Sequence, residues 1–171
     1  ADADAPARGG GHRDTDAARA KAGRLAAAAV GALLAQLTLG GYVRHSGAGL
    51  ACPDFPLCSG DVFPDRWLAV VHWVHRWLGV LLLAHFVHLA AAGRRAGAGG
   101  GPALALAVAA VQVALGITTV LLQLSPPIRA AHAAVGYALW GVVVWTALGI
   151  LGGGRTAARA SRDPLGTMAR A

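Results

Sequence analysis

Histidines inside apolar stretches are the residues of this sequence best suited to do chemistry. Five of the seven histidines lie in such stretches, namely His72, His75, His85, His88 and His132. A polar side chain is costly within a membrane-spanning segment and usually marks a functional position. His75 and His132 are each followed four residues later, on the same helical face, by a glycine, Gly79 or Gly136. Two imidazoles on different helices can hold the iron of a b-type haem, and the glycines would let the flat macrocycle approach the backbone.

The other polar residues of these stretches have competing interpretations. A histidine in a membrane helix is often a hydrogen-bonded packing residue, which is the alternative for His75 as well. His72, one turn earlier, is interpreted as a group on the substrate side or behind the ligand. His85 and His88 lie too deep to pair with another histidine, which favours a structural or interface role over a second haem across a dimer. Arg76 either binds a haem propionate, since a guanidinium suits carboxylate geometry, or extends to the membrane interface.

The only two cysteines, Cys52 and Cys58, lie in the segment HSGAGLACPDFPLCSG at residues 45–60. Five residues separate them, which is too wide for a CxxC redox motif, and two cysteines alone are too few for a zinc site. On the oxidising side of a membrane such a pair forms, or cycles through, a disulfide. The interpretation of the pair therefore depends on the elements that flank it.

Membrane helices are the elements expected to position these residues. The 171-residue chain is 56% hydrophobic and only 13% charged, whereas about 25% charged residues are usual in soluble domains. Four apolar segments, at about residues 25–43, 67–92, 102–124 and 128–151, are near or above the roughly 20 residues that span a bilayer. Because lipid cannot satisfy open backbone groups, each segment must be a helix. The predicted fold is an all-α, integral membrane four-helix bundle.

Basic residues set the expected orientation of the bundle. Eleven Lys and Arg residues lie in the two terminal segments and in the link between the second and third apolar segments, against three in the other two loops. The positive-inside rule then places both termini in the cytoplasm and the cysteine loop on the outer side of the cell membrane. The net charge of +7 is accordingly attributed to topology and not to nucleic-acid binding. We expect a transmembrane haem-binding domain at residues 24–152 between disordered cytoplasmic tails at 1–23 and 153–171.

A short pattern occurs twice along the chain. Residues 36–40, QLTLG, match residues 112–116, QVALG, and residues 75–79, HRWLG, match residues 132–136, HAAVG. In both cases a Q-x-x-L-G segment precedes an H-x-x-x-G segment. This order predicts two pseudo-repeated helical hairpins with His75 and His132 in equivalent positions.

Three longer stretches carry a family resemblance: GGYVRHSGAGLACPDFPLCSGDVFP, HWVHRWLG and QVALGITTVLLQLSPPIRAAHAAVG. Over about residues 30–145 the chain resembles the haem A synthase family, which converts the C8 methyl group of haem O to the formyl group of haem A. Members of that family have eight helices in two similar halves, each with a histidine pair and often a cysteine pair in its first outer loop. The resemblance implies that His75 and His132 bind haem iron and that Cys52 and Cys58 take the cysteine positions.

Two features differ from the family pattern. Four helices correspond to one half of a member, which implies a homodimer or pairing with a second four-helix half, with haem O synthase as a further candidate partner. The substrate-binding half of the family has a Glu three residues before the histidine of the His-Arg pair, where this chain has His72. His72 is therefore the candidate catalytic residue, although the H-x-x-H-R pattern resembles the half that holds haem b as a cofactor.

The function expected from these observations is oxidation of haem O to haem A for cytochrome oxidase, or haem b binding in support of it. The alternative is an electron-transfer membrane cytochrome b, which needs the same two histidines and has no use for the cysteine loop. A quinone-reducing thiol oxidoreductase is disfavoured, because it needs a second cysteine pair and the chain has only two cysteines.

Overall fold

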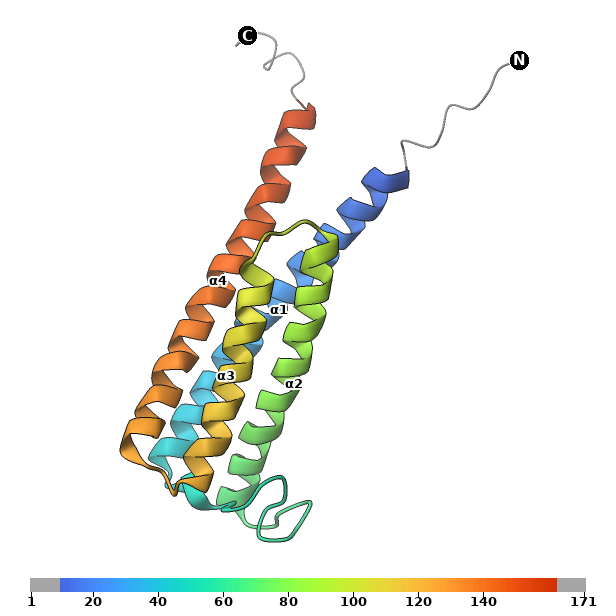
Figure 1. The fold of residues 1–171 in the computed structure, drawn as a ribbon. Helices are drawn as coiled ribbons and strands as arrows, with labels where there is room; N and C mark the ends of the chain where they lie inside the picture. The colour runs from blue at the N-terminus through green and yellow to red at the C-terminus, as the bar shows by residue number, and fades with distance from the viewer. Residues whose placement is uncertain (1–9, 163–171) are drawn as a thin grey trace, which may run out of the picture.

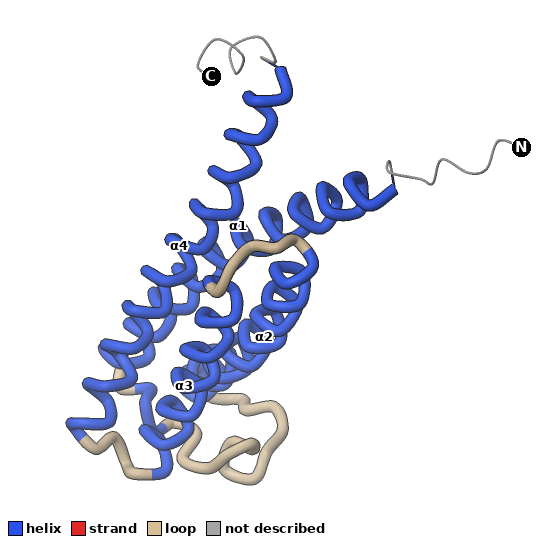
Figure 2. Tube along the Cα trace, turned by 45° about the horizontal axis from the view of Figure 1, so that its top comes forward, coloured by secondary structure: helices blue, strands red, loops and turns tan. Residues whose placement is uncertain are grey.

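The computed structural model describes residues 10–162, which are helical apart from the connections between helices (Figures 1 and 2). The elements are α1 (Gly10–His45), the short 3-10 helix η1 (Ala48–Leu50), α2 (Trp67–Arg95), α3 (Gly101–Leu121) and α4 (Pro126–Arg162). By length and composition, each of the four long helices can cross a membrane. The predicted all-α fold with four membrane-spanning helices is confirmed.

The four long helices form a ring in which each contacts its two neighbours. α1 packs on α2 and α4, and α3 also packs on α2 and α4. The start of α1 and the end of α4 lie at one end of the bundle, and the α1–α2 and α3–α4 connections lie at the other (Figure 1). The bundle therefore consists of two helical hairpins, with α2 and α4 facing each other across its diagonal.

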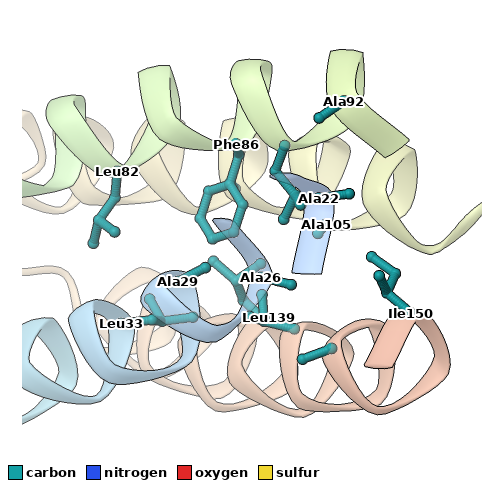
Figure 3. Packing of buried hydrophobic residues seen from close by; sticks show 14 residues of the cluster. Ala22, Ala26, Ala29, Leu33, Leu82, Phe86, Ala92, Ala105, Leu139 and Ile150 are labelled. Carbon is teal, nitrogen blue, oxygen red and sulfur yellow. The ribbon is translucent and has the colours of Figure 1, made fainter. Parts of the chain in front are cut away.

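A packed apolar cluster fills the half of the bundle nearer the start of α1 and the end of α4. In α1 its buried residues, Ala22, Ala26, Ala29 and Leu33, are spaced by three or four positions, the spacing of a continuous seam along one helix face. The ring of Phe86 extends from α2 into this seam and is fully buried (Figure 3). Small alanines on α1 and α3 leave room for the larger side chains of α2 and α4, so this half is closely packed.

The terminal helices extend further than expected. Disorder was expected through residue 23, whereas α1 begins at Gly10. Ala22 is fully buried, and a Cβ on Gly23 would lie 3.0 Å from the Leu151 side chain, so α1 packs closely on α4 before residue 24. Such small residues permit close approach of membrane helices. α4 continues to Arg162 in the same way, and the remaining parts of the expected tails, residues 1–9 and 163–171, lie outside the described residues.

The third helix ends at Leu121, earlier than the expected end at residue 124. Gln123 and Leu124 have positive φ angles of 49° and 61°, which cannot continue a right-handed helix. Ser125 precedes Pro126, and a residue before proline is disfavoured in the helical region. The chain therefore turns within four residues and restarts at Pro126, where a proline at the first helical position loses no hydrogen bond.

Candidate functional site

A central cavity lies between the four helices in the half of the bundle opposite the packed cluster. Its volume is ≈ 280 Å³, close to the lower limit of about 300 Å³ for small-molecule sites. All four long helices line it, together with Phe55 from the α1–α2 loop. The cavity brings together the predicted site residues other than the cysteines: His72, His75, Arg76, Gly79, His132 and Gly136.

His75 and His132 enter the cavity from the diagonally opposed helices α2 and α4. His75 is the ninth residue of α2 and His132 is the seventh residue of α4, which corresponds to about 12 Å and 9 Å of helix rise from the loop end. The Nδ1 atom of each ring is buried and has no hydrogen-bond partner. A packing histidine normally satisfies its buried ring nitrogens, so this arrangement favours a ligand-binding pair.

The two imidazole rings each lie against a glycine that was not among the predicted site residues, Gly40 or Gly116. A Cβ on Gly40 of α1 would lie 2.9 Å from Cε1 of His75, and a Cβ on Gly116 of α3 would lie 3.1 Å from Cε1 of His132. Any larger residue would displace the ring. The repeated Q-x-x-L-G pattern contained this information, because its glycine faces the histidine of the same hairpin.

The predicted glycines Gly79 and Gly136 make room for glutamine side chains. A Cβ on Gly79 would lie 3.3 Å from Nε2 of Gln36, and a Cβ on Gly136 would lie 2.9 Å from Nε2 of Gln112. Each H-x-x-x-G helix is thus fitted to the Q-x-x-L-G helix of its own hairpin. The duplicated pattern in the sequence corresponds to a duplicated set of contacts.

His72 joins the cavity to the cysteine loop. It is buried, with 4% of its surface exposed, and its Nδ1 accepts a hydrogen bond from the main-chain N–H of Cys52 at 3.3 Å. Because Nδ1 accepts, the proton of the neutral ring is on Nε2. The candidate catalytic histidine is therefore oriented by the main chain of the loop.

Arg76 also holds the loop. Its guanidinium donates hydrogen bonds to the main-chain oxygens of Asp54 at 2.6 Å and Cys52 at 3.4 Å. The same group lies 5.0 Å from the centre of the Phe55 ring, within the range of a cation–π contact. We expected Arg76 to meet a propionate or to reach the membrane interface, and the structure adds a third role, in which the side chain fixes the loop beside the cavity.

Cys52 and Cys58 form a disulfide, and both side chains are buried. Asp54 closes the turn between them, because its carboxylate accepts hydrogen bonds from the main-chain N–H groups of Ser59 at 2.7 Å and Gly60 at 3.1 Å. These bonds, the Ser59 bond foremost, lower the pKa of the exposed Asp54 carboxyl below its usual 3.8. The carboxylate therefore supports the loop at pH values above 3.8, and this support is lost as the pH falls through the lowered pKa.

Comparisons with known proteins agree with this geometry. The model of a family described as "Cytochrome oxidase assembly protein" matches residues 3–144. The chain belongs to this family. It is thus a multi-pass membrane member of the cytochrome oxidase assembly proteins, by the match and by its four spanning helices.

Individual members of the cytochrome oxidase assembly family are similar to the chain over much of its length. A haem A synthase from Rhizorhabdus wittichii is 34% identical over 151 residues, covering 81% of this chain and 44% of the relative. A haem A synthase from Rhodospirillum centenum is 36% identical over 145 residues, covering 73% of this chain and 39% of the relative. The chain therefore spans less than half the length of these relatives. No solved structure matches it.

The residues of this family member fit a haem better than a bare metal ion. Among the described residues no three His, Cys, Asp or Glu side chains gather as a metal site, and two histidines alone supply too few ligands for an ion such as zinc. A haem brings its own four equatorial ligands and needs only the axial pair. The glycines beside the rings and the unpaired ring nitrogens are consistent with such a group.

His85 and His88 lie outside the central cavity lining. His85 Nε2 is hydrogen-bonded to the main-chain oxygen of Leu25 in α1 at 2.9 Å. His88 is exposed, and its Nδ1 is 2.9 Å from the main-chain oxygen of Ala84 one turn earlier. His85 thus connects α2 to α1, and the structural or interface role expected of both residues stays a prediction.

The position of Arg76 leads to a prediction about the disulfide. Arg76→Ala removes two charge-assisted hydrogen bonds to the loop, each worth about 1.5–3 kcal/mol, and should expose the buried Cys52–Cys58 bond to solvent. We expect a bulky reductant to cleave this disulfide at least several-fold faster in Arg76→Ala than in the wild-type protein, as measured by thiol labelling over time. Arg66→Ala, at the start of α2 and exposed, is the control. Equal rates in all three proteins would show that Arg76 does not hold the loop.

Proposed function

We propose that this chain is a haem A synthase-type membrane oxidoreductase, or the haem-b-binding half of one. In this proposal His75 and His132 bind the haem iron, haem O is the substrate, and the cysteine loop faces the outer side of the cell membrane. The observation that carries the proposal is the meeting of the two histidines from α2 and α4 on one cavity. Family membership and the haem A synthase relatives support it.

In this proposal some residues of the chain bind the cofactor, and others fix the positions of the ligands and of the loop. Gly40 and Gly116 set the positions of the two imidazoles, and Arg76 holds the loop beside them. A bound haem supplies one-electron redox chemistry at its iron. We assign His72 the catalytic position, because it lines the cavity and its Nε2–H remains available once the Cys52 N–H occupies Nδ1.

The disulfide loop favours this function over an electron-transfer cytochrome b. His72 and Arg76 both bond to the main chain of the loop and both line the cavity, so the loop is part of the site. Cys52→Ser combined with Cys58→Ser removes about 2 kcal/mol of loop constraint by chain entropy. We expect this double variant to lose most of its haem O oxidation while keeping its haem, whereas a haem that is reduced and reoxidised equally well with and without the disulfide, in a protein that oxidises no haem O, would favour the cytochrome.

The test of haem binding is a reduced-minus-oxidised spectrum of the purified membrane protein. We expect the bands of a low-spin b haem in an amount close to one per four-helix unit. A protein purified from cells with sufficient haem that contains none would refute the proposal.

We also propose that catalysis requires a second four-helix unit of the same family, from a second copy or a Glu-bearing chain. The basis is that the described spans offer one histidine pair and that His72 stands where the resemblance places a glutamate. A neutral imidazole cannot supply the negative charge that a carboxylate would place beside a developing cation. Rapid turnover of haem O by a wild-type protein that is monomeric in detergent would contradict this assembly.

The substitution His72→Glu tests the chemical part of that proposal. A carboxylate at this position can still accept the Cys52 N–H bond, and it adds the missing charge. We expect haem O oxidation to rise in His72→Glu and to stay at or below the wild-type level in His72→Gln. The measurement is the amount of haem A formed, by extraction and chromatography. A rise in both variants would show that the carboxylate charge is not the cause.

A further inference from the structure

Gln36 and Gln112 lie behind the two histidines, and the function proposed above gives them no role. Nε2 of Gln36 donates a hydrogen bond to the main-chain oxygen of His75 at 2.8 Å. Because only the amide nitrogen can donate, this bond fixes the orientation of the amide and directs Oε1 away from that oxygen. Oε1 of Gln36 is buried and has no hydrogen-bond partner.

The second hairpin repeats this arrangement. Gln112 lies against Gly136 as Gln36 lies against Gly79, and its Oε1 is likewise buried without a partner. Each hairpin therefore leaves unpaired one acceptor, the glutamine Oε1, and one nitrogen that can donate, the histidine Nδ1. Unpaired buried polar atoms are uncommon in proteins, and this combination occurs at the same two positions of both repeats.

We propose that Gln36 and Gln112 are positioning residues, which accept hydrogen bonds from Nδ1–H of His75 and His132 when Nε2 of each ring binds haem iron. The inference rests on the haem ligation proposed above. A metal-bound imidazole usually donates its other N–H to an acceptor that fixes the ring and raises its basicity. Gln36 and Gly40 are one turn apart on the same face of α1; Gln36 bonds to the main-chain oxygen of His75, and a Cβ on Gly40 would meet the His75 ring, so the glutamine lies on the face that meets this histidine.

A competing acceptor is present in the second hairpin. The main-chain oxygen of Gln112 also lies beside the His132 ring. If main-chain oxygens hold the rings, the glutamine side chains serve only to pack the hairpins. The two roles differ in what they do to the electronic state of the haem iron.

The experiment uses Gln36→Met and Gln112→Met, which remove the acceptor with little change in volume. Gln123→Met is the matched control, because Gln123 is exposed in the α3–α4 turn and does not line the cavity. In the haem-loaded protein we expect the midpoint potential to rise in both cavity variants, because an imidazole without its acceptor donates less charge to ferric iron. We also expect haem affinity to fall about 10-fold, with no change in the control.

Gln36→Glu separates positioning from packing. It replaces the amide oxygen by a carboxylate, a stronger acceptor for Nδ1–H, so its midpoint potential should lie below the wild-type value. Met variants that match the control in potential and affinity would overturn the proposal, as would a potential of Gln36→Glu at or above the wild-type value. Should the Met variants fail to fold, the potential of Gln36→Glu alone decides. A wild-type protein without haem would instead refute the function on which the inference rests.

Discussion

Replacing either His75 or His132 by alanine should abolish the low-spin b-haem spectrum of the protein. Both residues line one cavity from opposed helices, so each would contribute one of the two histidines that hold the haem iron, and neither can replace the other. The loss of haem affinity should exceed the roughly 10–100-fold change that follows when a residue behind a ligand is altered. The measurement is haem content and spectrum of the purified variants.

Two other histidines of α2, which lie outside the cavity lining, provide the controls for this experiment. His88→Ala removes an exposed histidine of α2, and His85→Ala removes one that bonds to α1 away from the cavity. Both should retain the full spectrum. Intact haem in His75→Ala and His132→Ala would show that the pair does not hold the iron.

The second large loss of haem affinity is expected when a single methyl group is added at Gly40. Gly40→Ala places a Cβ 2.9 Å from Cε1 of His75, well inside the roughly 3.5–4.0 Å of a favourable carbon contact. Overpacking of this kind costs about 1–3 kcal/mol, and here the strain acts on the proposed ligand ring. We expect haem affinity to fall about 10-fold or more, and somewhat less for Gly116→Ala, where the distance is 3.1 Å.

Gly31→Ala is the matched control for this prediction. Gly31 lies in the same helix, and a Cβ there would meet nothing within 4 Å. Both substitutions gain the same helix propensity, so the difference between them isolates the contact with the ring. Equal haem affinity in Gly40→Ala and Gly31→Ala would mean that the His75 ring can shift away from the added methyl group without weakening haem binding.

The spans, the hairpin repeat and the convergence of the histidines could be predicted from the sequence. Hydrophobic length fixes the helices, and the recurring spacing between Gln, Gly and His fixes which faces meet. The contacts of Arg76 could not be predicted, because they depend on the path of an irregular loop with no periodic pattern. The Q-x-x-L-G repeat indicates that Gly40 and Gly116 occupy equivalent positions, but how closely they approach the rings could not be predicted, because that follows from the distance between the helices.

The packed cluster has a consequence for how the site exchanges protons and electrons with its surroundings. Its core side chains are apolar, and the polar groups of His85 and Thr146 in the same half are bonded to main-chain oxygens of Leu25 and Val142. The charged side chains that line the cavity, Arg44, Arg76 and Arg129, all lie towards the loop end. We therefore expect protons to reach the cavity from the loop end, beside the disulfide.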